Sequence, residues 1–125
     1  MTWTVAFHPA FDPEYGRLPT EVQNDLLSYA RALEARGPLV GRPYVDTLNG
    51  SAYANMKELR FNSAGGVWRV AFAFDPKRRA VLLVAGDKKG ENERRFYRRL
   101  IRTADQRYAA HLSVKQGGTG AKAAE

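Results

Sequence analysis

Three consecutive stretches in the middle of the chain alternate between large apolar residues and polar or small ones. They cover residues 56–62, 67–75 and 80–86 and are rich in Val, Phe and Leu. Such alternation is typical of β-strands, whose successive side chains point to opposite faces of a sheet. The segments between them contain two adjacent glycines and an Asp-Pro pair, which are typical of tight turns. The pattern predicts a meander of three antiparallel strands.

The second stretch of the meander places an arginine on a face with room around it. Trp68 and the other bulky residues of 67–75 point one way, whereas Arg69 shares the opposite face with Ala71 and Ala73. Because these neighbours are small, a ligand can approach the guanidinium group on that side of the sheet. Arg69 is therefore the first candidate for a functional residue.

The first stretch of the meander carries two cations on opposite faces. Period-2 alternation puts Lys57 on the face of Leu59, and puts Arg60 on the face of Glu58. Without a bulge in this strand, Lys57 and Arg60 cannot both line one concave site. Each also has a purely structural interpretation, as a solvated strand lysine and as the partner of an acidic residue such as Glu58.

The rest of the chain supplies one further strand and two long helices. Apolar residues recur at helical spacing over 20–36 and again from about 91 to 112. Residues 3–7 alternate like a strand, and 11–15 fit either a helical turn or an irregular link. Two Gly residues and one Pro interrupt 39–54, which predicts a surface loop.

These elements follow one another in the order β-α(-α)-β-β-β-α. Such an order predicts an α+β fold with a mainly antiparallel sheet, built from the N-terminal strand and the three-strand meander, with the helices packed on one face. Residues 1–112 are expected to form a single domain. Residues 113–125 contain few large apolar side chains, so we expect a flexible C-terminal tail there.

Positive charge is concentrated in one part of the chain. The net charge is +7, and residues 77–102 contain ten basic residues against three acidic ones, while the remainder is balanced. A neutral body with one cationic region is typical of proteins that bind a polyanion, although an acidic protein partner would be attracted equally well.

Several kinds of site are not supported by the residues. The chain has no cysteine, and neither His8 nor His111 has a metal ligand at a suitable spacing, so no metal site is predicted. No phosphate-binding glycine loop is present, so no cofactor is predicted either. Without a signal-peptide pattern or a membrane-spanning stretch, a cytoplasmic protein with no membrane contact is expected. Lys, Arg and Tyr remain, which suit either phosphate chemistry or passive nucleic-acid binding.

Four segments read together resemble a known family. They are GRPYVDTLNG at 41–50, NMKELRF at 55–61, GVWRVAFAFDPKRRAVLLVAGDKKG at 66–90, and RRFYRRLIRTADQRYAAHL at 94–112. This set resembles toxins of the RelE/ParE superfamily, in the HigB-like branch that is related to phage-derived proteins. The resemblance extends over residues 2–112.

The resemblance implies the toxin of a type II toxin–antitoxin system. Most members of this branch are similar to ribosome-dependent mRNA endonucleases (mRNA interferases), in which the 2′-hydroxyl of the message attacks the adjacent phosphate without a metal ion. The implied partners are the ribosome, mRNA and a cognate antitoxin, expected to be a small helix-turn-helix DNA-binding protein. Two alternatives remain open: a non-catalytic ParE-like inhibitor of DNA gyrase, and a basic nucleic-acid-binding module without activity.

The resemblance also implies roles for individual residues. Arg69 would stabilise the phosphate, Lys89 would stabilise charge, Tyr97 would stack on a base or transfer a proton, and Lys57 would be a further catalytic candidate. The identity of the general base stays open. The expected RNA-binding residues are Arg60, Lys88, Arg94, Arg95, Arg98 and Phe96, the last of which is an alternative to Tyr97 as the stacking ring.

Overall fold

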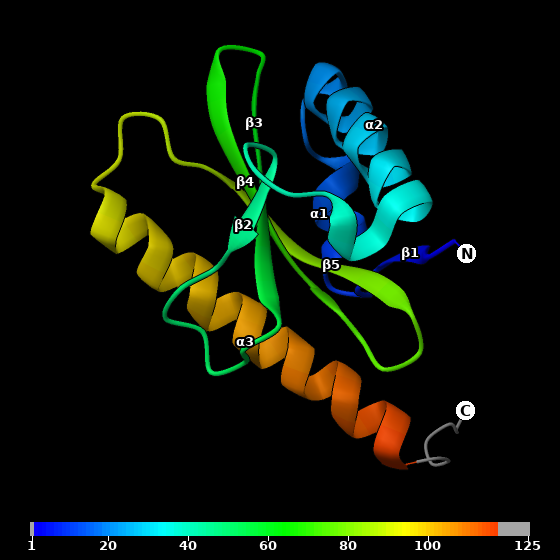
Figure 1. Cartoon of the computed structure of the whole chain (residues 1–125). Coiled ribbons are helices and arrows are strands. Elements are labelled where there is room, and N and C mark those ends of the chain that lie inside the picture. Colours follow the sequence, from blue (N-terminus) through cyan, green and yellow to red (C-terminus); the bar gives the residue numbers. More distant parts are fainter. Residues whose placement is uncertain (1, 118–125) are drawn as a thin grey trace.

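Five strands and three α-helices make up the computed structural model, which describes residues 2–117 (Figure 1). The elements in chain order are β1 (Thr4–Phe7), α1 (Phe11–Gly16), α2 (Thr20–Arg36), the short 3-10 helix η1 (Gly37–Leu39), β2 (Val45–Thr47), β3 (Met56–Ser63), β4 (Gly66–Phe74), β5 (Arg79–Asp87) and α3 (Glu93–Gly117). None of the helices among residues 2–117 combines the length and the apolar character that crossing a membrane would need.

The strands form one sheet in the order β1-β5-β4-β3-β2. β3, β4 and β5 form the predicted antiparallel meander, and β1 joins its edge as a parallel neighbour of β5. The predicted α+β class with a mainly antiparallel sheet is confirmed. The strand β2 was not predicted, because three residues between Gly and Pro signals are too few to show alternation. It pairs antiparallel with β3, from Val45 opposite Leu59 to Thr47 opposite Lys57.

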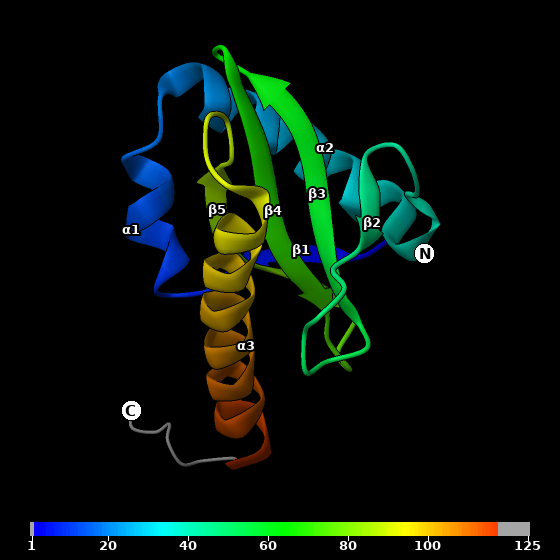
Figure 2. The same cartoon turned by 90° about the vertical axis from the view of Figure 1, so that its left-hand side faces the viewer.

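The helices cover both faces of the sheet, so the expectation that they pack on one face was wrong. α1 and α2 lie on one face and α3 crosses the other (Figures 1 and 2). The reason is that the meander is apolar on both sides. Leu59 and Phe72 pack in the core beneath α2, whereas Met56 and Ala73 pack in the core beneath α3. Each set must be covered to be removed from water.

A β-bulge and a close contact set the position of the first turns of α3. Ala71 pairs with Val84 but Phe72 pairs with Leu82, so β5 contains one extra residue at this point. Beyond the bulge, Gly86 lies opposite Arg69, and the ring of Phe96 packs directly on it. A Cβ atom at Gly86 would lie 2.8 Å from the Phe96 ring, so only glycine permits this approach.

The turn from β5 to α3 is held by side-chain hydrogen bonds. Asp87 Oδ1 accepts from the amides of Val67 (2.9 Å) and Lys89 (3.0 Å), and Asn92 Oδ1 accepts from the Arg95 amide (2.9 Å) as a helix cap. α3 continues to Gly117, beyond the predicted end of the helix at residue 112. Residues 118–125, the remainder of the predicted tail, lie outside the described residues.

The far end of α3 is joined to the β4–β5 turn through Asp75, whose side chain is fully buried. Its carboxylate accepts from the amides of Lys77 and Arg79, from Arg79 Nε (3.0 Å) and from His111 Nε2 (2.9 Å). Burial by itself raises the pKa of Asp75. The hydrogen bonds from His111, Arg79 and Lys77 outweigh burial and hold the pKa below its ordinary value.

We expect Asp75→Asn to lower the free energy of unfolding by about 3–5 kcal/mol at pH 7, because it leaves buried donors facing an amide. Urea unfolding measures this change. Because the folded protein lowers the pKa of Asp75, its ionised carboxylate contributes to the free energy of unfolding. This contribution is present above the pKa of about 3.9 in the unfolded chain, and it is lost as the pH falls through the pKa in the folded protein. The gap between wild type and variant should therefore narrow below about pH 4.

The matched control is Asp12→Asn, at an exposed position on α1 without a side-chain partner among residues 2–117. Its unfolding free energy should stay within about 0.5 kcal/mol of wild type. Equal, small effects of the two substitutions would show that the buried Asp75 contacts do not stabilise the fold.

Candidate functional site

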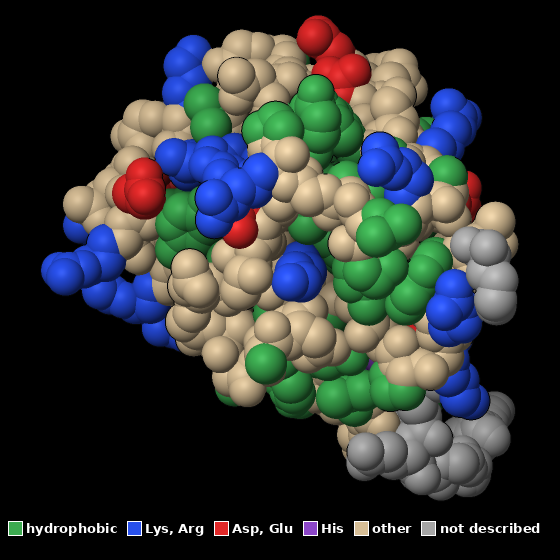
Figure 3. Space-filling view, viewed as in Figure 1, with side chains coloured by type: hydrophobic (Ala, Val, Ile, Leu, Met, Phe, Trp, Pro, Cys, Tyr) green, Lys and Arg blue, Asp and Glu red, His purple; other side chains and the backbone are tan. Residues whose placement is uncertain are grey.

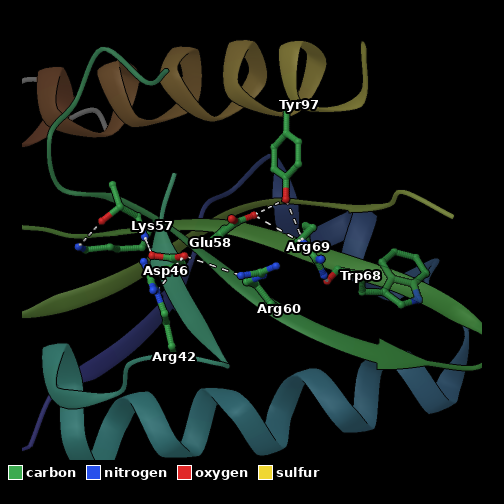
Figure 4. Close-up of polar contacts among 9 residues, drawn as sticks. Arg42, Asp46, Lys57, Glu58, Arg60, Trp68, Arg69 and Tyr97 are labelled. Carbon is green, nitrogen blue, oxygen red and sulfur yellow. Dashed lines mark hydrogen bonds and ion pairs between the residues drawn. The ribbon is translucent and has the colours of Figure 1, made fainter. Parts of the chain in front are cut away.

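Glu58, Arg69 and Tyr97 meet where the start of α3 lies over β3 and β4 (Figure 4). Arg69 Nε donates to Tyr97 Oη (3.1 Å), and the Tyr97 hydroxyl donates to Glu58 Oε1 (2.7 Å). Arg69 Nε also lies 3.7 Å from Glu58 Oε1, and Arg69 Nη1 donates to the Trp68 carbonyl (2.9 Å). We call Glu58, Arg69 and Tyr97 the polar triad.

The polar triad is largely shielded from water. The side chains of Arg69 and Glu58 are only 8% and 10% exposed. Burial first, and then the hydrogen bond to Glu58, raise the pKa of Tyr97 to about 12, although Arg69 acts in the opposite direction. Tyr97 is therefore neutral at pH 7, with its hydroxyl proton directed to the carboxylate. The guanidinium and the carboxylate offset each other, which reduces the cost of burying two charges.

Two hollows flank the polar triad and meet at Arg60. The polar hollow, as we call it, has a volume of about 230 Å³ and is lined by Thr47, Leu48, Asn49, Glu58, Arg60, Glu93 and Tyr97. The aromatic hollow has a volume of about 360 Å³ and is lined by Tyr29, Pro43, Tyr44, Arg60, Phe61, Asn62 and Arg69. Of the predicted residues, Arg60 lines both hollows, Tyr97 lines only the first and Arg69 lines only the second.

Arg60 is the more accessible of the two arginines in this region, with 38% of its side chain exposed. Its Nη1 atom lies 3.7 Å from Asp46 Oδ2, which Arg42 Nε also approaches at 3.3 Å (Figure 4). The hydrogen bond from the Thr47 amide, and then Arg42 and Arg60, lower the pKa of Asp46. Because such a surface pair is weak, Arg60 can turn from Asp46 to a bound anion at little cost.

Lys57 does not join the polar triad. The alternation of β3 turns it away from Glu58 and Arg60, and its Nζ atom donates to Thr47 Oγ1 (3.3 Å) (Figure 4). The predicted separation of Lys57 and Arg60 is confirmed, since no bulge interrupts the pairing of β3 with β4. The structure therefore does not bring Lys57 together with the other predicted catalytic residues.

The two lysines after β5 also lie apart from the polar triad. The ammonium group of Lys88 pairs with Glu93 (3.3 Å), whose side chain is 72% exposed. The backbone amide of Lys88 donates to the Val67 carbonyl. Lys89 is exposed, and its amide is held by Asp87. Within residues 2–117, neither ammonium group makes a hydrogen bond or ion pair with Arg69 or Tyr97.

Phe96 cannot stack on a base, so its assignment to RNA binding was wrong. It is only 3% exposed, because it belongs to the buried stripe of α3 with Leu100 and Ala104 and packs on Gly86. The next residue, Tyr97, points from α3 toward the sheet, where its hydroxyl meets Glu58 and Arg69 (Figure 4). Adjacent side chains of a helix point in different directions, so only one of Phe96 and Tyr97 can lie in the buried stripe of α3. The sequence alone does not show which of the two rings begins that stripe.

The predicted basic residues on α3 are on the surface. Arg94, Arg95 and Arg98 are exposed and form no ion pair within residues 2–117, whereas Arg99 pairs with Glu91. In Figure 3, Lys and Arg side chains gather on the left of the face shown, over the N-terminal part of α3 and the strands beside it. Three other basic residues of the predicted cationic segment, Lys77, Arg78 and Arg79, lie instead at the β4–β5 turn, where Arg79 pairs with Asp75 and Arg78 lies over the Trp3 ring. The structure therefore divides the positive charge that the sequence concentrates in one segment.

Glu58 is the residue of the site that sequence reasoning missed. Alternation already placed it beside Arg60, on the same face of the meander as Arg69. A carboxylate among the buried positions of a strand is costly unless it is paired, and this signal singles out Glu58. The sequence predicts Glu58 only as a structural partner of Arg60, which instead pairs with Asp46.

The histidines take part in separate contacts. His8 Nδ1 accepts from the Ala10 amide, and His111 donates to Asp75. Burial, and then Arg107 and His111, lower the pKa of His8. Among residues 2–117, no group of three or more His, Asp or Glu side chains is arranged to hold a metal ion.

A family model described as "Phage derived protein Gp49-like" matches residues 14–109. The chain therefore belongs to the phage-derived Gp49-like family. It is 51% identical over 86 residues to "Putative toxin HigB3" of Mycobacterium tuberculosis, covering 69% of this chain and 73% of that protein. It is 42% identical over 97 residues to "Putative toxin HigB2" of the same organism, covering 77% of this chain and 48% of that protein. The chain thus spans about half the length of the second relative.

The fold is also found in a solved structure. The free state of an arginine-substituted double mutant of E. coli toxin RelE superposes with a TM-score of 0.63, over 86% of this chain and 98% of that chain. At 13% sequence identity, this likeness shows the fold. The predicted resemblance to the RelE/ParE superfamily in its HigB-like branch is confirmed.

We expect Glu58→Gln to lower the pKa of Tyr97 from about 12, because the substitution removes the negative charge that opposes ionisation of the hydroxyl. NMR titration of ring-labelled tyrosine measures this change. Because the folded protein raises the pKa of Tyr97, the neutral hydroxyl contributes to the free energy of unfolding. This contribution is complete below the pKa of about 10 in the unfolded chain, and it is lost as the pH rises through the pKa in the folded protein. Wild type should therefore keep Tyr97 largely protonated at pH 11.

Glu93→Gln serves as the control, because Glu93 lines the same polar hollow without a hydrogen bond to Tyr97. It should leave the titration of Tyr97 unchanged. If Glu58→Gln and Glu93→Gln had the same effect, the hydrogen bond between Glu58 and Tyr97 would not be the cause of the raised pKa.

Proposed function

We propose that this protein is the toxin of a type II toxin–antitoxin system and cleaves mRNA on the ribosome. The names of its HigB relatives and the RelE-like fold support the toxin assignment. The observation that carries the nuclease assignment is that Arg69 and Tyr97, joined by a hydrogen bond, line two hollows that share Arg60, beside a shielded carboxylate. Cytoplasmic ribosomes are the expected site of action.

The proposed reaction is a transesterification within the RNA. The 2′-hydroxyl loses its proton and attacks the adjacent phosphorus, and the bond to the 5′-oxygen of the next nucleotide breaks, which leaves a cyclic phosphate and a free 5′-hydroxyl. The protein must accept one proton, stabilise the charge on the phosphorane and return one proton to the leaving oxygen.

Arg69 and Arg60 are the proposed charge-stabilising residues. Arg69 is held by Tyr97, Glu58 and the Trp68 carbonyl, so its guanidinium does not need to reorganise when charge develops on the phosphate. Arg60 lies opposite Arg69 in the pairing of β3 with β4, which places two guanidinium groups on one side of the sheet. Planar guanidinium groups match phosphate geometry better than ammonium groups do.

Glu58 and Tyr97 are the proposed proton-transfer residues. Glu58 lines the polar hollow and accepts a hydrogen bond from the Tyr97 hydroxyl at 2.7 Å, so its carboxylate faces the hollow in a position to take the proton of the 2′-hydroxyl. Tyr97 remains protonated at neutral pH, so it has a proton to offer to the leaving oxygen. Lys57 faces away from this hollow, which makes it a weaker candidate for the base.

Lys88, Lys89, Arg94, Arg95 and Arg98 are proposed to hold the RNA backbone and the surrounding ribosomal RNA. They are separate from the polar triad, and the arginines are free of ion pairs within residues 2–117. Contacts of this kind supply affinity that is independent of base sequence and sensitive to salt.

We expect Arg69→Lys to slow message cleavage by about 100-fold or more, because an ammonium group cannot reproduce the guanidinium contacts to the phosphorane. Primer extension on ribosome-bound messages gives the rate, and thermal unfolding shows whether the variant is folded. Arg31→Ala is the control, since it removes a cation from the exposed surface of α2 and should leave the rate unchanged.

The same strains separate the alternatives. Growth arrest by wild type with coding-region cleavage, lost in Arg69→Lys, is the expected result. Growth arrest with intact messages and a DNA-damage response would replace the nuclease with a gyrase inhibitor. The absence of any effect on growth or messages would leave a basic nucleic-acid-binding module.

The proposed antitoxin should be acidic where it contacts residues 77–102. Its complex with this protein is expected to weaken several-fold between about 0.05 and 0.5 M NaCl, because salt screens charges on exposed surfaces. Calorimetry at several salt concentrations measures the effect. Arg98→Glu should weaken the complex at low salt more than Arg31→Glu does, and an affinity independent of salt would contradict this prediction.

A further inference from the structure

The aromatic hollow lies beside the polar triad, but the proposed chemistry makes no use of its rings. It has a volume of about 360 Å³, and both Arg60 and Arg69 reach its wall. Its other side is formed by aromatic side chains from α2, β3 and the segment before β2. A ligand that fills it would therefore contact apolar ring surface and two guanidinium groups at once.

The rings of this hollow form a graded series from the core to solvent. Tyr29 stacks on Phe61, with ring centroids 5.0 Å apart and planes at 25°, and Tyr44 lies against Tyr29 at 5.6 Å and 42°. Phe61 is 5% exposed, whereas Tyr44 is 49% exposed. The series therefore ends in a ring that still has free surface on which another planar group can stack.

The main chain fixes the position of Tyr44 relative to the arginines. The Tyr44 amide donates to the Gly41 carbonyl (3.1 Å), and the Tyr44 carbonyl accepts from the Arg60 amide (2.8 Å). Arg42 and Arg60 both approach Asp46, which ties the preceding segment to the strands. Tyr44 is thus held on a rigid edge of the sheet and is not carried by a free loop.

A nucleotide of single-stranded RNA is the ligand that this combination of groups fits. Its base offers a planar surface for the Tyr44 ring, its phosphate offers negative charge to Arg60 and Arg69, and the Asn62 amide at the hollow can donate to and accept from a base edge. Asp46 is the acidic group nearest to Arg60 in this arrangement, and a phosphate would take its place as the partner.

We propose that the aromatic hollow is a nucleobase-binding subsite in which Tyr44 stacks on the base of a nucleotide next to the scissile phosphate. This inference rests on the proposed nuclease function and adds a substrate contact to it. Tyr44 positions the RNA and does not take part in proton transfer.

The test compares Tyr44→Ala, Tyr44→Phe and Leu39→Ala in ribosome-dependent cleavage. Tyr44→Ala should raise KM for the message about tenfold or more, with kcat little changed at saturation, because loss of a stacking ring weakens binding. Tyr44→Phe keeps the ring and should restore wild-type KM. Leu39→Ala removes an apolar side chain that is 78% exposed outside the hollow, and it should have no effect.

A binding measurement separates this proposal from the proposed function. A short oligoribonucleotide is titrated into the full chain, and the ring resonances of Tyr44 are followed by NMR. Shifts at Tyr44 that saturate with the RNA support the subsite even if wild type cleaves no message. Unchanged Tyr44 resonances, or a wild-type KM for a folded Tyr44→Ala variant, would overturn it. Shifts with an acidic peptide but none with RNA would also overturn it, in favour of a protein contact.

Discussion

The architecture depends on a meander that is apolar on both faces. Leu59, Val70 and Phe72 need a cover on one side, and Met56 and Leu83 need one on the other. Covering a single face would leave a large apolar surface in water, at a cost that grows with its area. α2 and α3 therefore lie on opposite sides of the sheet, and β1 and β2 extend the edges of the meander.

The candidate site lies where the N-terminal end of α3 covers the sheet. α3 meets the sheet closely where Phe96 packs on Gly86. The next residue of the helix, Tyr97, contacts the polar side chain of Arg69 on β4. There the core gives way to Glu58 and Arg69, two charges that are shielded by the helix and satisfied by each other. A charged pair in such surroundings keeps its geometry, since loss of either partner leaves an uncompensated buried charge.

The arrangement also separates two uses of positive charge. The guanidinium of Arg69 is fixed by hydrogen bonds and suits a transition state, whereas the exposed arginines of α3 form a diffuse field that attracts a polyanion. Between them lies Arg60, half exposed and only loosely held by Asp46. The net charge of the sequence reports the diffuse field but says nothing about the fixed contacts.

The sequence by itself determined the meander, the faces of Arg69 and Lys57, and the two long helices, because periods of 2 and 3.6 are local properties of the chain. Only the tertiary structure decided that Phe96 is buried while Tyr97 reaches Arg69, and that Glu58 completes the polar triad. It also decided that a three-residue strand at 45–47 forms one edge of the sheet. These outcomes depend on which residues meet across the sheet. Such contacts join positions that are distant in sequence, so the periodicity of apolar residues along the chain does not predict them.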